Sequence, residues 1–224
     1  MASYENIVAI VWDLDGTLID SAPDLAGALN TLLREHSLPQ LGAETVRRMI
    51  GNGVAKLIER GFRAVGQTLS GAEIETLQPR FMQIYSGHAT DLTRLYPGAR
   101  QALQGFYEHG IRQAICTNKP ERVSHAILES LGLSYFFDIV VGGDTAAHRK
   151  PHTLPLRMCL DALSTDKNKS LMVGDSSIDV ATAKGVGMPV GIVTHGYSRE
   201  PVETLGADFL ISDLSSLPYE VALQ

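Results

Sequence analysis

The sequence has few cysteines and few aromatic residues. Its 224 residues include two cysteines, Cys116 and Cys159, and aromatic side chains make up 6% of the chain. The two cysteines lack the close spacing of metal ligands, and each falls inside an apolar pattern. We therefore expect both thiols to be buried core groups, with no role in a disulfide or as a nucleophile.

The chain also lacks a basic stripe and any long apolar run. It carries 19 lysines and arginines against 25 aspartates and glutamates, which gives a formal charge of −6. We therefore expect no nucleic acid and no anionic membrane as a partner, although a locally basic site could still take an anionic substrate. No apolar run approaches membrane-spanning length, and the start of the chain has no basic segment followed by an apolar one. These absences predict a soluble cytoplasmic protein.

What the chain does contain is a globular composition arranged in alternating strands and helices. Hydrophobic residues make up 44% and charged residues 20%, which suits one large domain or a domain with a smaller companion. Short apolar runs predict strands at residues 7–12, 111–116, 137–141, 170–173, 190–193 and 209–211. Helical patterns lie between them, at residues 99–109, 121–131, 153–163 and 179–185. This alternation predicts a parallel α/β sheet.

Residues 21–96 break this rhythm, because they contain helical patterns and no convincing strand. Ser21 resembles a helix N-cap, and leucines at positions 25, 29, 32 and 33 follow it on one helical face. A later pattern contains Pro79, which should kink or restart its helix. The sequence therefore predicts a core of residues 1–19 and 96–224, with a helical module of residues 20–95 inserted after the first strand. Such a module could move as a lid or form a rigid accessory domain.

Polar clusters follow the predicted strands at four places. In chain order they are Asp13 with Asp15, Thr117 with Asn118, Lys150, and Asp175 with Asp179. Two carboxylates fixed at the tip of a buried strand repel each other, and such a pair is tolerated where a cation, a proton or a reaction uses it. Ligands of an open parallel sheet bind outside the carboxyl ends of its strands. Each cluster alone could be a turn, a helix start or a surface lysine, but their common placement predicts one site.

The clusters suit phosphoryl transfer. Asp13 is a carboxylate nucleophile that can form an aspartyl-phosphate. Its approach to a phosphate dianion is opposed by repulsion of about 4 kcal/mol for unit charges roughly 4 Å apart at an effective dielectric of about 20. Asp13 and Asp175 offer hard oxygens for Mg²⁺, and Lys150 offers a point charge to the phosphate and the nucleophile. The sequence thus predicts a magnesium ion and a lysine that together offset this repulsion.

The remaining polar residues fit supporting roles in the same reaction. The Thr117 hydroxyl and the backbone amide of Asn118, at an expected helix start, can hold phosphate oxygens. Asp15 is spaced to face the leaving group, where it can donate a proton to the departing alkoxide and then accept one from the attacking water. Asp179 can hold a metal-bound water. The predicted catalytic residues are Asp13, Asp15, Thr117 and Lys150.

These motifs resemble those of the haloacid dehalogenase superfamily of phosphotransferases. The matching segments are Asp13-Leu14-Asp15-Gly16-Thr17-Leu18, Thr117-Asn118-Lys119-Pro120, Lys150-Pro151 and Gly174-Asp175-Ser176 with Asp179. The resemblance covers nearly the whole chain and implies a Rossmann-like, doubly wound parallel sheet with an inserted four-helix cap that closes over a small substrate. It also implies dependence on Mg²⁺, with the backbone carbonyl of Asp15 as a further metal ligand.

Within the superfamily the chain looks most like the phosphoglycolate phosphatase branch. The supporting segments are residues 20–25, Gly51-Asn52-Gly53, Gly142-Gly143-Asp144 and Gly196-Tyr197. This resemblance implies 2-phosphoglycolate as the substrate, with its phosphate on the core and the rest of the molecule recognised by the cap. The cap candidates are Gly51, Asn52, Gly53 and Lys56, although the glycines could equally form a helix-breaking turn.

Other functions remain open on the same residues. Asp15 disfavours a dehalogenase or a phosphonate hydrolase of the superfamily. A sugar-phosphate phosphatase or phosphomutase would share all four clusters and is the first alternative. A non-catalytic phosphate-binding regulator on an inherited fold is the second. We expect a small phosphorylated metabolite as the partner, and the sequence leaves the choice between monomer and homodimer open.

Overall fold

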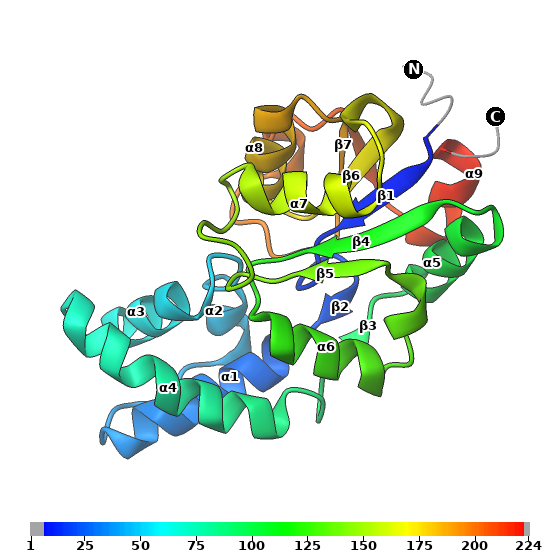
Figure 1. Ribbon diagram of the computed structural model, residues 1–224. Helices are drawn as coiled ribbons and strands as arrows, with labels where there is room; N and C mark the ends of the chain where they lie inside the picture. Colours follow the sequence, from blue (N-terminus) through cyan, green and yellow to red (C-terminus); the bar gives the residue numbers. More distant parts are fainter. Residues whose placement is uncertain (1–6, 222–224) are drawn as a thin grey trace.

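Six parallel strands form one open sheet in the computed structural model, which describes residues 7–221 (Figure 1). The strands are β1 (Ala9–Trp12), β4 (Arg112–Cys116), β5 (Ile139–Val141), β6 (Ser170–Gly174), β7 (Val190–Val193) and β8 (Phe209–Ile211). Their order is β5-β4-β1-β6-β7-β8, so β1 pairs with β4 on one side and with β6 on the other. The sheet extends in both directions from β1, which confirms the predicted doubly wound α/β fold.

The central strand is apolar on both faces because helices cover both. Ile10 and Trp12 belong to one buried cluster, and Ala9 and Val11 belong to another, as the alternation of side chains along a strand requires. One face is covered by α5 (Ala99–Glu108), α6 (Glu121–Ser130) and α9 (Leu217–Val221), and the other by α7 (Leu154–Ala162) and α8 (Ser177–Val186). Packing on both faces therefore fixes the carboxyl end of β1, where the first functional residues lie.

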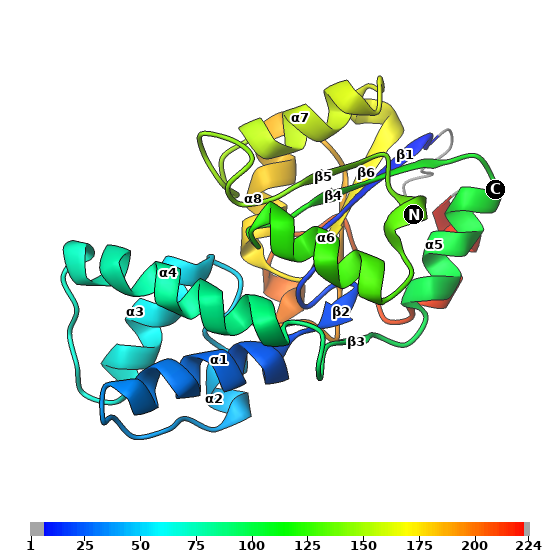
Figure 2. The same ribbon diagram turned by 60° about the horizontal axis from the view of Figure 1, so that its bottom comes forward.

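Four further helices form a group at the carboxyl end of the sheet, which we call the helical module (Figures 1 and 2). They are α1 (Ala22–Glu35), α2 (Ala43–Arg47), α3 (Val54–Ala64) and α4 (Gly71–His88). The leucines predicted on one face of α1 are all buried, and α1 packs against the other three helices. The amphipathic pattern of α1 is thus explained by its place at the centre of the module.

Two short strands join the helical module to the sheet. β2 (Ile19–Asp20) and β3 (Arg94–Leu95) pair antiparallel where the chain enters and leaves the module. The prediction that residues 21–96 hold no strand is therefore wrong at β3. A strand of two residues is too short to produce an alternating pattern in the sequence, and its partner lies more than seventy residues away in the chain.

Pro79 lies inside α4 without dividing it. The helix runs continuously from Gly71 to His88, so the predicted restart is wrong. Proline removes one backbone N–H from the helical ladder, and here Pro79 and the exposed Glu75, whose carbonyl loses that bond, both face solvent. A capping box at Ser70 and Glu73 starts the helix, and buried side chains near its other end anchor it. These contacts compensate for the lost hydrogen bond.

The start of α1 is tied to both connections of the module. Ser21 occupies the N-cap position, as predicted, but its hydroxyl donates to Asp15 instead of capping the helix. The carboxylate of Asp24 accepts hydrogen bonds from the backbone N–H groups of Leu92 and Thr93 and from the Thr93 hydroxyl. The beginning of α1 is thereby bonded to the β1 end and to the segment that leaves α4.

Both cysteines pack in the core, as predicted. Cys116 ends β4 and Cys159 lies in α7, and each is fully buried. The Cys159 thiol donates to the carbonyl of Ile115 at 3.5 Å. Within residues 7–221, no helix combines the length and the apolarity that crossing a membrane requires.

Candidate active site

Asp13, the first of the predicted site residues, continues the central strand β1. The N–H of Asp13 donates to the carbonyl of Val173 in β6 at 2.8 Å, which extends the sheet by one residue. The Asp13 carboxylate lies 2.9 Å from the Nζ of Lys150, and the residue is 8% exposed. Burial raises the pKa of Asp13 to about 6, against the lowering effect of Lys150 and together with the charge of Asp179. Asp13 is therefore a buried carboxylate held by one cation.

Gly16 makes the turn that follows the two aspartates. Its φ of +89° lies in the left-handed region that favours glycine. A Cβ at this position would lie 2.3 Å from Oδ2 of Asp175. Glycine is therefore required both by the backbone conformation and by the close approach of the β6 end.

Lys150, Asp175 and Asp179 gather around Asp13. The Nζ of Lys150 lies 2.7 Å from Oδ1 of Asp179, and this lysine is 3% exposed. One carboxylate oxygen from each of Asp13, Asp175 and Asp179 lies within 4.8 Å of the other two. Burial, followed by the charges of Asp179 and Asp13, raises the pKa of Asp175. Three buried carboxylates against the ammonium of Lys150 form a donor set of hard oxygens with excess negative charge, which fits a divalent cation.

Asp179 is fixed by the loop that carries it. Its Oδ2 accepts hydrogen bonds from the N–H of Asp175 at 3.2 Å, the N–H of Ser176 at 3.1 Å and the Ser176 hydroxyl at 2.8 Å. The bond from the Ser176 N–H belongs to a capping box at the start of α8. The bonds direct Oδ1 toward Lys150, so Asp179 positions this lysine, a contact that sequence reasoning missed.

Thr117 and Asn118 lie at the end of β4 and are 2% and 6% exposed. The Thr117 hydroxyl accepts from the N–H of Lys119 at 3.2 Å. The Asn118 side chain donates to the carbonyl of Gly51 at 3.0 Å and to that of Lys150 at 3.1 Å, which joins the helical module to the core. The helix α6 has Pro120 at its N-cap, so Asn118 precedes the helix instead of starting it, contrary to expectation.

Asp15 faces Lys119, a residue to which sequence reasoning assigned no role. The Nζ of Lys119 lies 2.8 and 3.0 Å from the two carboxylate oxygens of Asp15, and the Ser21 hydroxyl also donates to Asp15. Lys119 is 5% exposed, and its Nζ lies 4.9 Å from the ring centre of Tyr85. Burial opposes the charge, but Asp15 outweighs it and the pKa of Lys119 is raised. In the sequence, the position of Lys119 directly after Thr117 and Asn118 could have identified it as a site residue.

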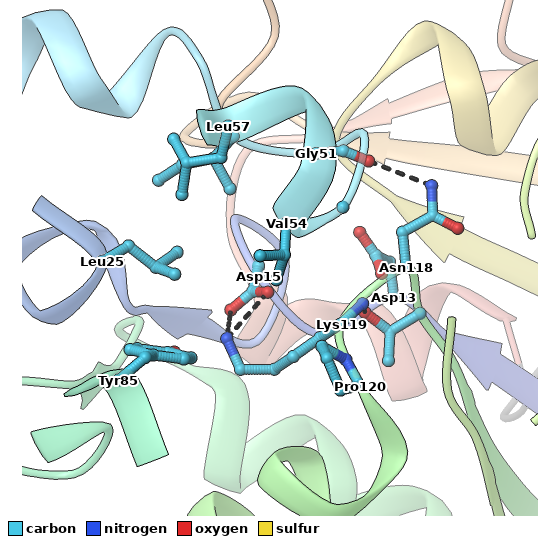
Figure 3. Close-up of a pocket in the computed structure, with 13 residues that line it drawn as sticks. Asp13, Asp15, Leu25, Gly51, Val54, Leu57, Tyr85, Asn118, Lys119 and Pro120 are labelled. Carbon is cyan, nitrogen blue, oxygen red and sulfur yellow. Dashed lines mark hydrogen bonds and ion pairs between the residues drawn. The ribbon is translucent and has the colours of Figure 1, made fainter. Parts of the chain in front are cut away.

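These residues open into a pocket between the strand ends and the helical module (Figure 3). The empty space of the pocket, including its open mouth, is about 460 Å³. The core contributes Asp13, Asp15, Thr117, Asn118, Lys119 and Pro120, and the module contributes Leu25, Ile50, Gly51, Gly53, Val54, Leu57 and Tyr85. The core side is therefore polar and charged, while the module side is mostly apolar. This arrangement suits a small polar ligand covered by apolar side chains.

Of the predicted module residues, Gly51 and Gly53 line this pocket. Their φ values of +106° and +82° lie in the left-handed region. A Cβ on Gly53 would lie 2.3 Å from Nη1 of Arg149, a core residue. Both glycines therefore suit the backbone of the turn before α3, and Gly53 also allows this turn to approach the core closely.

The other two predicted module residues lie elsewhere. The Asn52 carbonyl oxygen Oδ1 accepts from Arg199 at 3.0 Å, and Asn52 lines a neighbouring cavity. Lys56 lies on the exposed side of α3, where its Nζ pairs with Glu59 at 2.6 Å. The structure thus brings the two glycines to the pocket and leaves Asn52 and Lys56 outside its lining.

Tyr197 connects the carboxylate cluster to the β2 strand and was missed from the sequence as a site residue. Its N–H donates to Oδ2 of Asp175 at 2.5 Å, and its hydroxyl donates to Asp20 at 2.7 Å. The same hydroxyl accepts from the N–H of Ser21 at 2.9 Å. Arg47 in α2 donates twice to the Asp20 carboxylate, at 3.1 and 2.9 Å. One hydrogen-bond network therefore links the carboxylate cluster, through Asp175, to the strand β2, through Asp20, and to the helical module, through Arg47.

Known proteins are similar to this chain in sequence and in fold. A family model described as haloacid dehalogenase-like hydrolase matches residues 10–193. Phosphoglycolate phosphatase from Rhodospirillum rubrum is 45% identical over 213 residues, covering 93% of this chain and 88% of that protein. The enzyme of the same name from Caulobacter vibrioides is 40% identical over 213 residues, covering 95% and 90%. A crystal structure of a predicted phosphoglycolate phosphatase from Haemophilus somnus superposes with a TM-score of 0.88 at 29% identity, covering 95% and 96% of the two chains.

The chain belongs to the haloacid dehalogenase-like hydrolase family. The predicted enzyme class, a phosphoric monoester hydrolase similar to the phosphoglycolate phosphatases, is confirmed by these relatives. The similarity extends over nearly the full length of both chains, so the sheet and the helical module are both part of it.

Proposed function

We propose that this chain is a Mg²⁺-dependent phosphatase that hydrolyses a small phosphate monoester, with 2-phosphoglycolate as the leading substrate, through an aspartyl-phosphate on Asp13. The observation that carries the proposal is the buried Asp13–Lys150 ion pair beside Asp175 and Asp179 at the end of the central strand. A carboxylate at this place is accessible from the pocket and is held by a cation that a phosphate would also contact.

The proposed metal is Mg²⁺, held by Asp13 and Asp175 with the backbone carbonyl of Asp15. The closeness of three buried carboxylates supports this, because hard oxygen ligands with excess negative charge suit Mg²⁺. Oδ1 of Asp179 accepts from Lys150 and its Oδ2 accepts from its own loop, so Asp179 would position Lys150 and the loop instead of binding the ion directly. The bound ion would offset the repulsion between a carboxylate nucleophile and a phosphate dianion.

The protein groups would act in two steps. In the first, an Asp13 oxygen bonds to phosphorus while the bond from phosphorus to the ester oxygen breaks, and Asp15, in its protonated form, gives its proton to that departing oxygen and becomes a carboxylate. In the second, Asp15 takes a proton from water as the water oxygen attacks phosphorus, which releases phosphate and restores Asp13. The phosphate oxygens would be held during both steps by the ammonium of Lys150, the hydroxyl of Thr117 and the backbone N–H of Asn118.

We infer that residues 20–95 act as a cap over residues 1–19 and 96–224. The apolar lining supplied by α1, α3 and α4 would exclude water from the pocket when a substrate is bound. The relatives named phosphoglycolate phosphatase, at 45% and 40% identity, favour 2-phosphoglycolate among small esters.

The test is phosphate release from 2-phosphoglycolate with Mg²⁺ by the wild type and by Asp13→Asn. Asparagine keeps the size of the side chain but is a poor nucleophile, so kcat should fall by about 10³-fold or more. Asp161→Asn, at an exposed carboxylate of α7, is the matched control and should retain full activity. Removal of divalent cations with EDTA should also abolish wild-type activity.

A panel of other esters separates the alternatives. Equal kcat/KM for 2-phosphoglycolate and for sugar phosphates would contradict the leading substrate. Formation of a phosphorylated isomer without free phosphate would indicate a mutase. Unchanged phosphate release by Asp13→Asn, or none by the wild type, would contradict the proposed phosphatase mechanism.

A further inference from the structure

Lys119 is a buried cation on the side of the pocket where the leaving group must lie. The proposed reaction places the phosphate at Asp13 and the ester oxygen toward Asp15. Whatever the substrate carries beyond that oxygen then points into the part of the pocket bounded by Asp15, Tyr85 and the apolar side chains of the module (Figure 3). Among the described residues that line this pocket, Lys119 is the one with a positive charge.

The position of Lys119 makes its charge available to a ligand. An ammonium has three N–H donors, and Asp15 accepts two of them at 2.8 and 3.0 Å. The Lys119 side chain is 2% exposed, so water does not screen its charge effectively. On the module side, Tyr85 offers an uncharged hydroxyl and a ring whose centre lies 4.9 Å from Nζ, and the lining residues Leu25 and Val54 offer no polar group. A buried ammonium of this kind binds an anion more strongly than an exposed lysine does.

The partner that Lys119 already holds shows which anion fits. Asp15 presents a carboxylate with both oxygens directed at Nζ. In an ester of a 2-hydroxy acid, a carboxylate stands one carbon away from the ester oxygen. When that oxygen faces Asp15, the substrate carboxylate therefore lies next to the group that Asp15 binds. An uncharged substituent at the same place would leave Lys119 bonded to Asp15 alone.

We propose that Lys119 binds a carboxylate of the substrate, and that this contact selects phosphate esters of small hydroxy acids over uncharged esters of the same size. The inference rests on the proposed phosphatase function and names its specificity residue. It moves substrate recognition from the loop of the module, where Asn52 and Lys56 lie outside the pocket lining, to the core segment that follows β4.

The first test compares two substrates on one protein. 2-Phosphoglycolate and 2-hydroxyethyl phosphate have similar size, but only the first has a carboxylate. The wild type should prefer the first, and Lys119→Met should lower this preference in kcat/KM by about 10- to 100-fold, the value of a charge-assisted hydrogen bond. The ratio is independent of the fraction of folded protein. Lys184→Met, at an exposed lysine of α8, should leave it unchanged.

The second test needs no turnover, and in its double variant both members of the Asp15–Lys119 ion pair are neutralised. Asp15→Asn and the double variant Asp15→Asn with Lys119→Met are titrated with 3-phosphonopropionate, which has the chain length of 2-phosphoglycolate, and with uncharged-chain propylphosphonate, by calorimetry in the presence of Mg²⁺. The single variant should bind 3-phosphonopropionate at least about 10-fold more tightly than propylphosphonate, and the double variant should lose this difference.

The outcomes separate this inference from the proposed function. Release of phosphate by the wild type with an unchanged substrate ratio in Lys119→Met would overturn the role of Lys119 and leave the phosphatase intact. Equal binding of the two phosphonates by Asp15→Asn would overturn it as well. Absence of phosphate release from every ester by the wild type would instead contradict the proposed function itself.

Discussion

The strand ends of the core and the helical module treat charge in opposite ways. At the strand ends, Asp13, Lys119, Lys150, Asp175 and Asp179 are all buried and bonded to one another or to the loops that carry them. In the module, the pairs of Lys56 with Glu59 and of Arg80 with Glu35 lie at the surface, and the pair of Arg47 with Asp20 is partly buried. Buried charges are costly unless they are paired or used, whereas surface pairs contribute little. The contrast supports the proposal that the core residues carry out the chemistry and that the module encloses the pocket.

Among substitutions that test this contrast, Lys150→Met should cause the largest loss of activity and stability. The substitution removes the ammonium between Asp13 and Asp179 and leaves both carboxylates buried without it. Activity should fall by about 10²- to 10³-fold, and the free energy of unfolding in EDTA should fall by about 3 kcal/mol. Mg²⁺ should restore part of the stability but not the activity, measured by denaturant titration and phosphate release.

A matched control for this prediction is Lys169→Met, at an exposed lysine before β6. It should change neither quantity measurably. Equal losses in the two variants would show that the buried position of Lys150 has no special importance, which would break the comparison between the two regions.

A smaller effect is expected where the two regions meet. Tyr197→Phe removes a hydroxyl that donates to Asp20 and accepts from the N–H of Ser21. The groups left without it are buried or partly buried, so the free energy of unfolding should fall by about 1–3 kcal/mol, while kcat falls less than about tenfold. Tyr219→Phe, at a tyrosine that is 68% exposed, is the control and should be neutral. Wild-type stability in the Tyr197 variant would contradict the proposed connection.

The smallest effect is expected for Lys56→Met in the module. Its ammonium pairs with Glu59 on the surface, and such pairs are worth less than about 1 kcal/mol. Measured kcat/KM for 2-phosphoglycolate should change by less than about twofold. A tenfold loss specific to this substrate would return recognition of the carboxylate to the module and would argue against the role proposed for Lys119.

The two regions also differ in what the sequence could predict. The core strands were predicted within about two residues because buried parallel strands are continuous apolar runs with polar residues at their ends. Because the carboxyl ends of parallel strands meet at one edge of the sheet, the sequence alone predicted that Asp13, Lys150 and Asp175 lie together. The residues that the sequence did not identify, Lys119 and Tyr197, acquire their importance from partners 104 and 177 positions away. Pairings of this kind leave no local pattern.

Errors in the module have a similar origin. The continuous α4 depends on the capping box before Pro79 and on the buried Phe81 and Tyr85 after it, and the strand β3 depends on pairing with β2 across the whole inserted segment. Propensity and periodicity describe neighbours in sequence, so tertiary contacts that override them are not visible there. The sequence left Lys56 open between a surface residue and a contact to the substrate carboxylate for the same reason: a charged residue beside a loop does not reveal which side of the helix faces the pocket.

The most direct test of the central claim is a crystal structure of the protein with Mg²⁺ and beryllium fluoride, a mimic of a phosphoryl group. We expect the mimic attached to a carboxylate oxygen of Asp13, the ion between Asp13 and Asp175, and Lys150 in contact with the fluorides. An ion bound away from these carboxylates, or a mimic bound with Asp13 turned away from it, would contradict the account.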